Sequence, residues 1–379
     1  MVTATRLEAA AAAVTVMSNR SEVTDWAARY FGQWWNATSV EAATVCAGTV
    51  LVADVDPQAY EALTLLVHDG RHTEEVEYAR HRMLVARDGE DVIATSPDEA
   101  IAYRSSPLSG RLTLTGIGVM ELSLAAARLA REVIRGHLLR DGWAVLHSSA
   151  VVRPQDGATL LAFGGKGAGK TTTALLLASS GWRLLANDRV LVRPTGTRGV
   201  EVVPWPSAAA VGLGLLESLG WGAAARGHVE EGGAFHPTQH EAVTTALLVG
   251  DFTPLWEDGK RRERKVQVFP DQFTSLFGVE LATGGRAAAL LFPRVDAESS
   301  PDGVGGAVRA LGDDDFMSGA TEDRYPDIFE LAGGVDGGGR RSARDEVSAR
   351  LAVLPHRTVR LTHDVPASVA ALRKVAEAI

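Results

Sequence analysis

The chain has 379 residues, 46% hydrophobic and 22% charged, a balance that predicts a folded protein of about two domains. Its net charge of −9 argues against a nucleic acid or an anionic membrane as partner, because such binding depends on neutralising phosphates. A single cysteine, Cys46, excludes an internal disulfide, and we find neither a targeting segment nor a long apolar run, so we expect a soluble, cytoplasmic protein.

The first part of the chain predicts a small α+β domain. Residues 1–20 are alanine-rich, and we expect them to form a disordered or helical extension. Residues 21–31 have helical spacing, and residues 77–94 predict a β-hairpin that turns at Asp88-Gly89. We therefore expect an N-terminal α+β domain over residues 21–114. It carries no recognisable chemical motif, which favours a role in substrate recognition or oligomer contact.

The clearest helix in the sequence covers residues 118–140. Its apolar side chains recur along one stripe, and Gly142 follows as a stop signal. The helix leads into residues 143–146, an apolar segment that predicts a strand ending at His147. We therefore expect a second domain that begins near residue 115 and continues to residue 379.

The central motif of the chain is an octapeptide that fits G-x-x-x-x-G-K-[ST] at every fixed position. The strand predicted over residues 159–163 and the helix predicted over residues 172–180 give it the context that a phosphate-binding loop requires. We expect Lys170 to contact the β- and γ-phosphates and Thr171 to bind Mg²⁺. The alternative is a flexible glycine-rich turn. The residues expected to bind nucleotide are Gly164, Gly165, Lys166, Gly167, Ala168, Gly169, Lys170, Thr171 and Thr172.

Two polar residues next to other predicted strands are candidates for chemistry. Residues 182–186 predict a strand that ends at Asp188, and a carboxylate in that place is well positioned for metal binding or catalysis. The alternative for Asp188 is a capping or turn residue. His147 is a weaker candidate, because a histidine after a strand is more often structural.

Three segments together resemble the kinase domain of HPr kinase/phosphorylase and of the HPr-kinase-related proteins. They are Leu146-His147-Ser148, the GGKGAGKT loop and residues 183–190. The resemblance is strong over residues 144–193 and looser from about residue 115 onward. It implies an α/β fold with the P-loop sheet of HPr kinase and the phosphoenolpyruvate carboxykinases. It also implies that Asp188 orients or deprotonates an acceptor hydroxyl and that His147 lies near the γ-phosphate.

The chain departs from the family pattern at two positions. Asn187 stands where the family has the first aspartate of an Asp-Asp pair, and Thr172 stands where the bifunctional enzymes have a glutamate. The glycine-rich signature that follows the aspartate pair in those enzymes has no counterpart. The resemblance therefore implies the kinase activity and leaves the phosphorylase activity open.

Three later segments have possible roles at such a site. The basic run over residues 260–265 is either a solvated face or a contact for phosphate or an acidic acceptor, with Lys265 best placed. The glycine- and aspartate-rich stretches 301–318 and 332–339 predict loops suited to closing over the site. Residues 224–242 contain His228, His236 and His240. Pro237 interrupts their spacing, so we expect a mobile loop rather than a metal site.

The function expected from the sequence is transfer of the γ-phosphoryl group of ATP, with Mg²⁺, to a hydroxyl acceptor. A serine or threonine of a protein or precursor peptide is the expected acceptor, and a small molecule is an alternative. A second class stays open: a nucleotide-gated binding protein with a degenerate kinase site. ATP and GTP are not distinguished at this level, and a homo-oligomer is compatible with the sequence.

Overall fold

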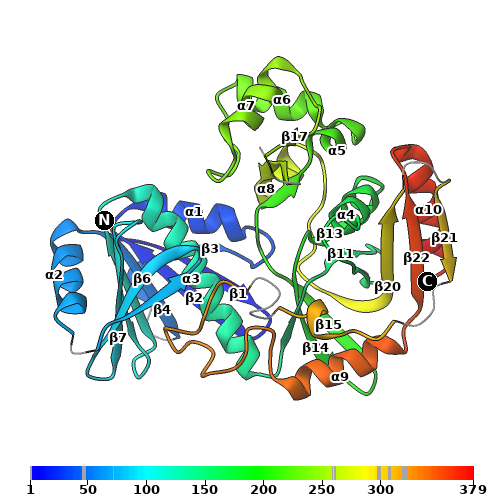
Figure 1. Ribbon diagram of the computed structural model, residues 1–379. Coiled ribbons are helices and arrows are strands. Elements are labelled where there is room, and N and C mark those ends of the chain that lie inside the picture. The colour runs from blue at the N-terminus through cyan, green and yellow to red at the C-terminus, as the bar shows by residue number, and fades with distance from the viewer. Residues whose placement is uncertain are drawn as a thin grey trace. The chain divides into compact units, whose positions relative to one another are not determined.

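The computed structural model describes residues 2–44, 48–70, 72–257, 259, 262–296, 300–305, 309–317 and 323–379. It is a mixed α/β structure whose sheets combine parallel and antiparallel strands (Figure 1). The chain divides into two compact units. The first contains Met1–Val145 and Phe316–Arg344, and the second contains Leu146–Asp315 and Asp345–Ile379.

The first unit is built on a sheet with the strand order β3-β1-β2-β4-β9-β8-β7-β6-β5. The β2–β4 and β4–β9 pairs are parallel, and the other pairs are antiparallel. The strands are β1 (Thr3–Ala9), β2 (Ala12–Ser18), β3 (Thr38–Val40), β4 (Thr49–Val55), β5 (Glu74–Tyr78), β6 (His81–Asp88), β7 (Asp91–Ser96), β8 (Ile101–Ser106) and β9 (Arg111–Gly116). The predicted hairpin around Asp88-Gly89 is confirmed as the β6–β7 pair.

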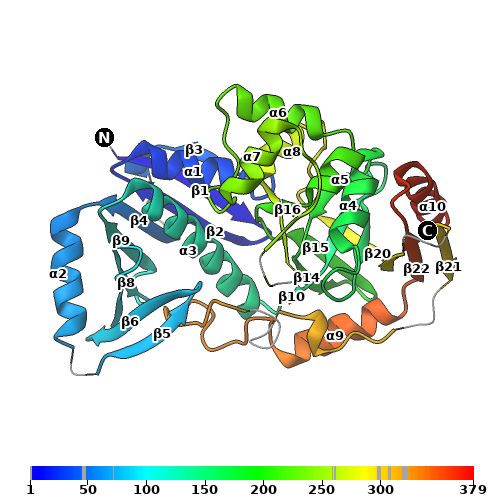
Figure 2. The same ribbon diagram turned by 45° about the horizontal axis from the view of Figure 1, so that its top comes forward.

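Three helices pack on this sheet: α1 (Ser21–Phe31), α2 (Pro57–His68) and α3 (Val119–Arg140). Figure 2 shows α3 lying across the sheet, where it packs against α1 and the strands β2, β4 and β9, while α2 packs against β6 to β9. The sequence of α1 explains its packing, since Val23, Ala27 and Phe31 follow helical spacing and all three are buried. Among the described residues, no helix combines the length and the hydrophobicity needed to cross a lipid bilayer.

The alanine-rich start of the chain forms the hairpin β1–β2 and is neither a helix nor a disordered extension. The two strands pair in antiparallel register from Thr3 and Ser18 to Ala9 and Ala12. Leu7, Val14 and Val16 are fully or almost fully buried. The local preference of alanine for helix is therefore overridden by burial of the larger apolar side chains of these strands.

The first unit also extends further than the domain boundary expected at residue 115. Helix α3 belongs to this unit, and residues 323–344 return to it from the far end of the sequence. Hydrogen bonds to its main-chain oxygens hold the returning segment: Ala79 N–H donates to Arg324 O, at 2.8 Å. Ser105 Oγ likewise donates to Phe329 O, at 3.1 Å. The boundary at residue 115 was predicted from local sequence features, and such features carry no information on contacts between residues far apart in the chain.

The second unit contains a sheet with the order β14-β15-β20-β12-β11-β13, in which β20 also pairs with β22, and β22 with β21. Helices α4 and α10 pack against each other, and α10 also contacts β21 and β22 (Figure 1). The elements are β11 (Ser149–Val152), β12 (Ala158–Ala162), α4 (Lys170–Ser179), β13 (Arg183–Ala186), β14 (Val190–Thr195), β15 (Gly199–Pro204), β20 (Gly285–Val295), β21 (Asp302–Gly305), β22 (His356–Leu361) and α10 (Val365–Glu377).

Between β15 and β20 the chain forms a group of short elements. They are β16 (Ala209–Val211), α5 (Leu213–Ser218), α6 (Gly222–Glu230), α7 (Glu241–Val249), β17 (Leu255–Trp256), β18 (Glu263–Arg264), β19 (Val266–Val268) and α8 (Pro270–Ser275). Strand β16 precedes α5 and pairs with β19. The loop expected over residues 224–242 includes most of α6, so that expectation is wrong at its start. Strand β10 (Ala144–Leu146) and helix α9 (Arg341–Ala352) span boundaries between the two units.

Candidate functional site

Strands β12, β11 and β13 bring three polar segments to one edge of the second sheet. Ser149 at the start of β11 pairs with Ala162 at the end of β12, and Ala150 pairs with Ala186 at the end of β13. Both neighbours run antiparallel to β11, so their carboxyl ends lie beside its amino end. The loop after β12, the residues after β13 and the residues before β11 therefore converge.

The loop after β12 is shaped by glycines and closed by Lys170. Gly164 has a φ of 146° and Gly169 a φ of 102°, values that favour glycine. Lys170 Nζ lies 2.6 Å from Gly164 O and 3.4 Å from Gly165 O, so the side chain donates back across the loop. Residues 165–167 at the tip of the loop are exposed.

Helix α4 begins directly at Lys170, so its first turn forms one wall of the loop. The start is fixed by Thr173, whose N–H and Oγ1 both donate to Gly169 O, at 2.8 and 2.9 Å. The N–H groups of a first helical turn have no intrahelical acceptor, and the helix dipole is positive at this end. Thr171 and Thr172 lie in this turn. The arrangement therefore suits an anion.

Asn187 links the loop to the neighbouring strands. Its carbonyl oxygen accepts hydrogen bonds from Thr171 Oγ1 at 3.2 Å and from Ser149 Oγ at 2.6 Å. Its side-chain Oδ1 accepts a hydrogen bond from Ser207 Oγ at 3.3 Å, and the residue is buried. Asn187 therefore holds the Thr171 hydroxyl at the sheet edge, and its amide is engaged with Ser207.

Asp188 and His147 contact each other at this edge. His147 Nε2 lies 3.1 Å from Asp188 Oδ1, and Arg189 Nη1 lies 3.1 Å from Asp188 Oδ2. Burial by itself would raise the pKa of Asp188. The hydrogen bond from His147 and the charges of Arg189, His147 and Lys170 outweigh burial and lower the pKa to about 2. The carboxylate is therefore ionised throughout the physiological range.

Lys170 is 9% exposed, and burial lowers the pKa of its ammonium group. The negative charges of Asp188 and Asp315 act in the opposite direction. The Lys170 ammonium group and the Asp188 carboxylate after β13 thus interact electrostatically. The structure brings Lys170, Asp188 and His147 close to one another.

Asp315 is a site residue that the sequence analysis missed. It is buried, its carboxylate accepts from Arg309 Nη2 at 2.9 and 3.0 Å, and its main-chain oxygen accepts from the N–H of His147 at 2.8 Å. Residues 309–315 therefore support His147 and add a negative charge near Lys170. The Asp-Asp-Asp run at 313–315 was the available signal, but it lay within a stretch interpreted as a loop.

The other segments that the sequence suggested for the site form local contacts, belong to the first unit or fall partly outside the described residues. Lys265 Nζ lies 3.6 Å from Glu263 Oε2, and Lys260 and Arg261 are outside the described residues. The stretch 301–318 contains β21, with residues 306–308 and 318 outside the description, and the stretch 332–339 belongs to the first unit. Cys46 is also outside the described residues.

The three histidines of residues 224–242 each have a nearby partner. His228 Nε2 lies 3.1 Å from Gln272 Nε2, and His236 Nδ1 lies 2.8 Å from Thr238 Oγ1. His240 accepts from the N–H of Ala242 and caps α7. In the described part of the chain, no three histidine, cysteine or acidic side chains form a group suited to a metal ion.

The candidate site therefore combines a helix start suited to an anion, a buried lysine, a threonine hydroxyl and an ionised carboxylate held by a histidine. This arrangement can bind a phosphorylated ligand and orient a polar group beside it. In comparisons with known proteins, no family model matches the chain and no curated protein shows significant sequence similarity to it.

Proposed function

We propose that this protein is an ATP-dependent kinase that transfers the γ-phosphoryl group to a hydroxyl acceptor. The observation that carries the proposal is the convergence, at one sheet edge, of the phosphate loop with Lys170 and the His147–Asp188 pair. The proposal includes the finer fold assignment, a P-loop kinase domain of the type found in HPr kinase and the phosphoenolpyruvate carboxykinases. Its support is the resemblance of residues 144–193 together with this geometry.

In the proposed complex, the triphosphate lies along residues 164–172. The loop and first-turn N–H groups donate to phosphate oxygens, and Lys170 neutralises charge on the β- and γ-phosphates. Lys170 is buried against the loop, so it reaches the phosphates with little loss of side-chain freedom. Phosphoryl transfer spreads negative charge over the moving group, which makes these cationic and N–H contacts the main source of rate enhancement.

The residues at the sheet edge also fit a Mg²⁺ ion bound with the nucleotide. Mg²⁺ prefers oxygen ligands and commonly takes only one or two from the protein when phosphates supply others. The Thr171 hydroxyl and the Asp188 carboxylate are such oxygens, and both adjoin Asn187. When bound, Mg²⁺ would supply positive charge that offsets the negative charge of the phosphates. Thr171 and Asp188 are the residues that would hold it.

Asp188 is proposed to position the acceptor hydroxyl. Its pKa of about 2 makes it a weak base. Asp188 is therefore better suited to accept a hydrogen bond from the hydroxyl than to remove the hydroxyl proton early in the reaction. His147 holds one carboxylate oxygen and Arg189 the other, which fixes the direction of the remaining lone pairs. His147 is in turn supported through its N–H by Asp315.

The proposed acceptor is a serine or threonine of a protein or precursor peptide, with a small-molecule hydroxyl as the alternative. One observation favours a different class of function, a nucleotide-gated binding protein. Asn187 replaces an acidic residue of the family pattern, and its side chain is engaged with Ser207. Such a protein would bind ATP without transferring phosphate.

The test is to incubate the full chain with Mg·ATP and peptides encoded beside its gene, and to search by mass spectrometry for phosphate on serine or threonine. A kinase yields phosphopeptide in proportion to ADP. A binding protein yields neither, although ATP still raises its melting temperature by mass action. ATP-induced stabilisation without phosphotransfer to any such peptide or candidate metabolite would therefore favour the binding protein.

Two variants separate binding from chemistry in this assay. Lys170→Ala should weaken ATP binding by about tenfold or more, equivalent to ~1.4 kcal/mol or more, and abolish turnover. Lys374→Ala, which removes an exposed lysine from α10 in the same unit, is the control and should leave ATP binding unchanged. Asp188→Asn should bind Mg·ATP yet lose transfer by about 10²-fold or more. Unchanged ATP affinity in Lys170→Ala would refute the assignment of the loop.

A further inference from the structure

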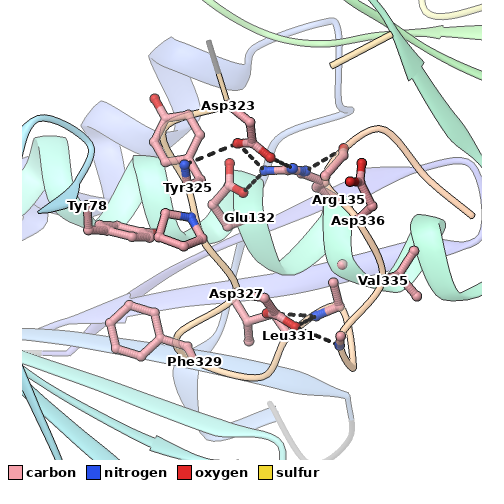
Figure 3. Close-up of a pocket in the computed structure, with 15 residues that line it drawn as sticks. Tyr78, Glu132, Arg135, Asp323, Tyr325, Asp327, Phe329, Leu331, Val335 and Asp336 are labelled. Carbon is pink, nitrogen blue, oxygen red and sulfur yellow. Dashed lines mark hydrogen bonds and ion pairs between the residues drawn. The ribbon is translucent and has the colours of Figure 1, made fainter. Parts of the chain in front are cut away.

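A cavity lies within the first unit, and none of the candidate-site residues described above lines it. It has a volume of about 190 Å³ and lies among helix α3, the end of β5 and residues 323–337 (Figure 3). In this view the aromatic side chains of Tyr78, Tyr325 and Phe329 lie to the left, and Arg135 and Asp336 lie to the right. A cavity of ~150 Å³ in another protein admits benzene, so this one is large enough for a small organic molecule.

The charged wall of this pocket is a built network. Arg135 Nη1 donates to Glu132 Oε2 at 2.7 Å, and the same guanidinium forms an ion pair with Asp323 through two of its nitrogens. Arg135 Nε also donates to Gly337 O, at 3.2 Å. The side chains of Glu132 and Arg135 are 7% and 4% exposed. These hydrogen bonds fix the geometry of the wall, and they use only one of the two carboxylate oxygens of Glu132, Oε2.

Two buried polar atoms that belong to lining residues have no hydrogen-bond partner in the described part of the chain: Glu132 Oε1 and the Tyr78 hydroxyl. Glu132 Oε1 lies 3.6 Å from Arg131 Nε, an ion-pair distance beyond hydrogen-bond length. Tyr78 is 2% exposed, and its pKa is raised well above the ordinary value by burial and then by the charge of Glu132. Buried polar groups in proteins are nearly always satisfied, so these atoms indicate a missing partner.

The charge balance of the lining favours a cation as that partner. Four acidic side chains line the pocket, Glu132, Asp323, Asp327 and Asp336, against one basic side chain, Arg135. Arg131 and Arg344 face two of these acids from outside the lining, with nitrogen–oxygen distances of 3.6 and 3.7 Å. With both counted, four acids stand against three bases, which leaves an excess of one negative charge.

The aromatic wall suits the apolar part of such a molecule. Tyr78 packs edge-on against Tyr325 and Phe329, with ring centroids 5.8 and 5.6 Å apart. These rings offer apolar surface. The guanidinium groups of Arg128 and Arg131 already lie over the rings of Tyr78 and Tyr325, 5.8 and 5.1 Å from the ring centroids. An ammonium group attached to a short hydrocarbon body therefore matches both walls.

We propose that this pocket binds a small primary amine. Its ammonium group donates hydrogen bonds to Glu132 Oε1 and to the Tyr78 hydroxyl oxygen, and its apolar body packs against the rings of Tyr325 and Phe329. This assignment does not depend on the proposed kinase activity, because every residue that it uses lies in the first unit.

The test is calorimetric titration of the full chain with benzylamine, using benzyl alcohol as the neutral analogue of the same shape. We expect benzylamine to bind about tenfold or more tightly than benzyl alcohol, because only the ammonium meets the unpaired carboxylate oxygen with a full charge. Tyr78→Phe should weaken benzylamine binding by about three- to tenfold, the effect of one hydrogen bond. Tyr60→Phe makes the same change on α2, outside the pocket, and should leave binding unchanged.

Folding of the variants can be checked independently. Tyr78→Phe removes a hydroxyl that has no hydrogen-bond partner among the described residues, so its melting temperature should equal or exceed that of the wild type. Glu132→Gln should remove the preference for benzylamine over benzyl alcohol. The proposal is overturned if wild-type protein does not bind benzylamine, if Tyr78→Phe binds it equally well, or if a crystal grown with benzylamine contains only water in the pocket.

Discussion

At the scale of single residues, the candidate site depends on how neighbours alter Asp188. Its carboxylate is partly buried, which opposes ionisation, yet it accepts from His147 and lies beside two further cations, Arg189 and Lys170. The same contacts that lower its pKa also fix its orientation. The electrostatic and positional roles of His147 are therefore two consequences of one hydrogen bond.

The pKa of Asp188 is a direct measure of this arrangement. We expect its carboxyl carbon to titrate near pH 2 in ¹³C NMR, and its pKa to rise toward 3.8 in His147→Ala. Because the folded-state pKa lies below the ordinary value, the stabilisation is complete above about pH 4 and is lost as pH falls through about 2. Acid unfolding should therefore show a smaller pH-dependent loss in His147→Ala. Titration of the wild-type residue near pH 4 would contradict this account.

At the scale of secondary-structure elements, residues 331–332 pack closely against Gly136 of helix α3. A Cβ atom on Gly136 would lie 2.5 Å from Leu331 O and 3.0 Å from Ala332 N, so the backbone passes directly over this glycine. The neighbouring atoms are main-chain atoms, which cannot move aside as a flexible side chain can. This contact fixes how residues 323–337 pack against helix α3.

This contact predicts a reversal of the usual effect of alanine in a helix. Gly136→Ala should destabilise the protein by about 1–3 kcal/mol, because the methyl group overpacks the contact with Leu331. Gly227→Ala in α6 is the matched control: its Cβ would meet nothing within 4 Å, so it should stabilise by about 0.5–1 kcal/mol. Urea unfolding measures both. A stabilising Gly136→Ala would show that α3 and residue 331 are not in close contact.

At the scale of the whole molecule, each unit has its own core and its own candidate site. The glycine-rich loop over residues 164–169, Asp188 and Asp315 lie in the second unit, and the pocket beside Tyr78 and Glu132 lies in the first. The chain joins them at 145–146, 315–316 and 344–345. Ligands of the two sites should therefore stabilise different parts of the chain.

Hydrogen exchange can resolve the two effects. Mg·ATP at 100 times its Kd should stabilise its site by about 2.7 kcal/mol and slow exchange across residues 163–189. Benzylamine should instead slow exchange in α3 and residues 323–337. Lys170→Ala should remove only the ATP effect. Protection of β1 to β9 by ATP, equal in size to that of α4, would contradict the placement of the nucleotide.

The sequence by itself determined the elements whose causes are local. The glycines at 164, 167 and 169, the apolar run before them and the helix after them predicted the β12–loop–α4 unit that the structure contains. Helix α3 and the turn at Asp88-Gly89 were also predicted, because periodic burial and turn preference act over a few residues.

Only the tertiary structure decided which distant residues meet. His147 and Asp188 were each recognised in the sequence, but their 3.1 Å contact follows from β11 lying between β12 and β13. Asp315 beside His147, the strands at residues 3–18 and the return of residues 323–344 to the first unit depend on burial against segments far along the chain. The local sequence pattern does not predict such contacts, because the free energy that stabilises them comes from packing that exists only once the chain has folded.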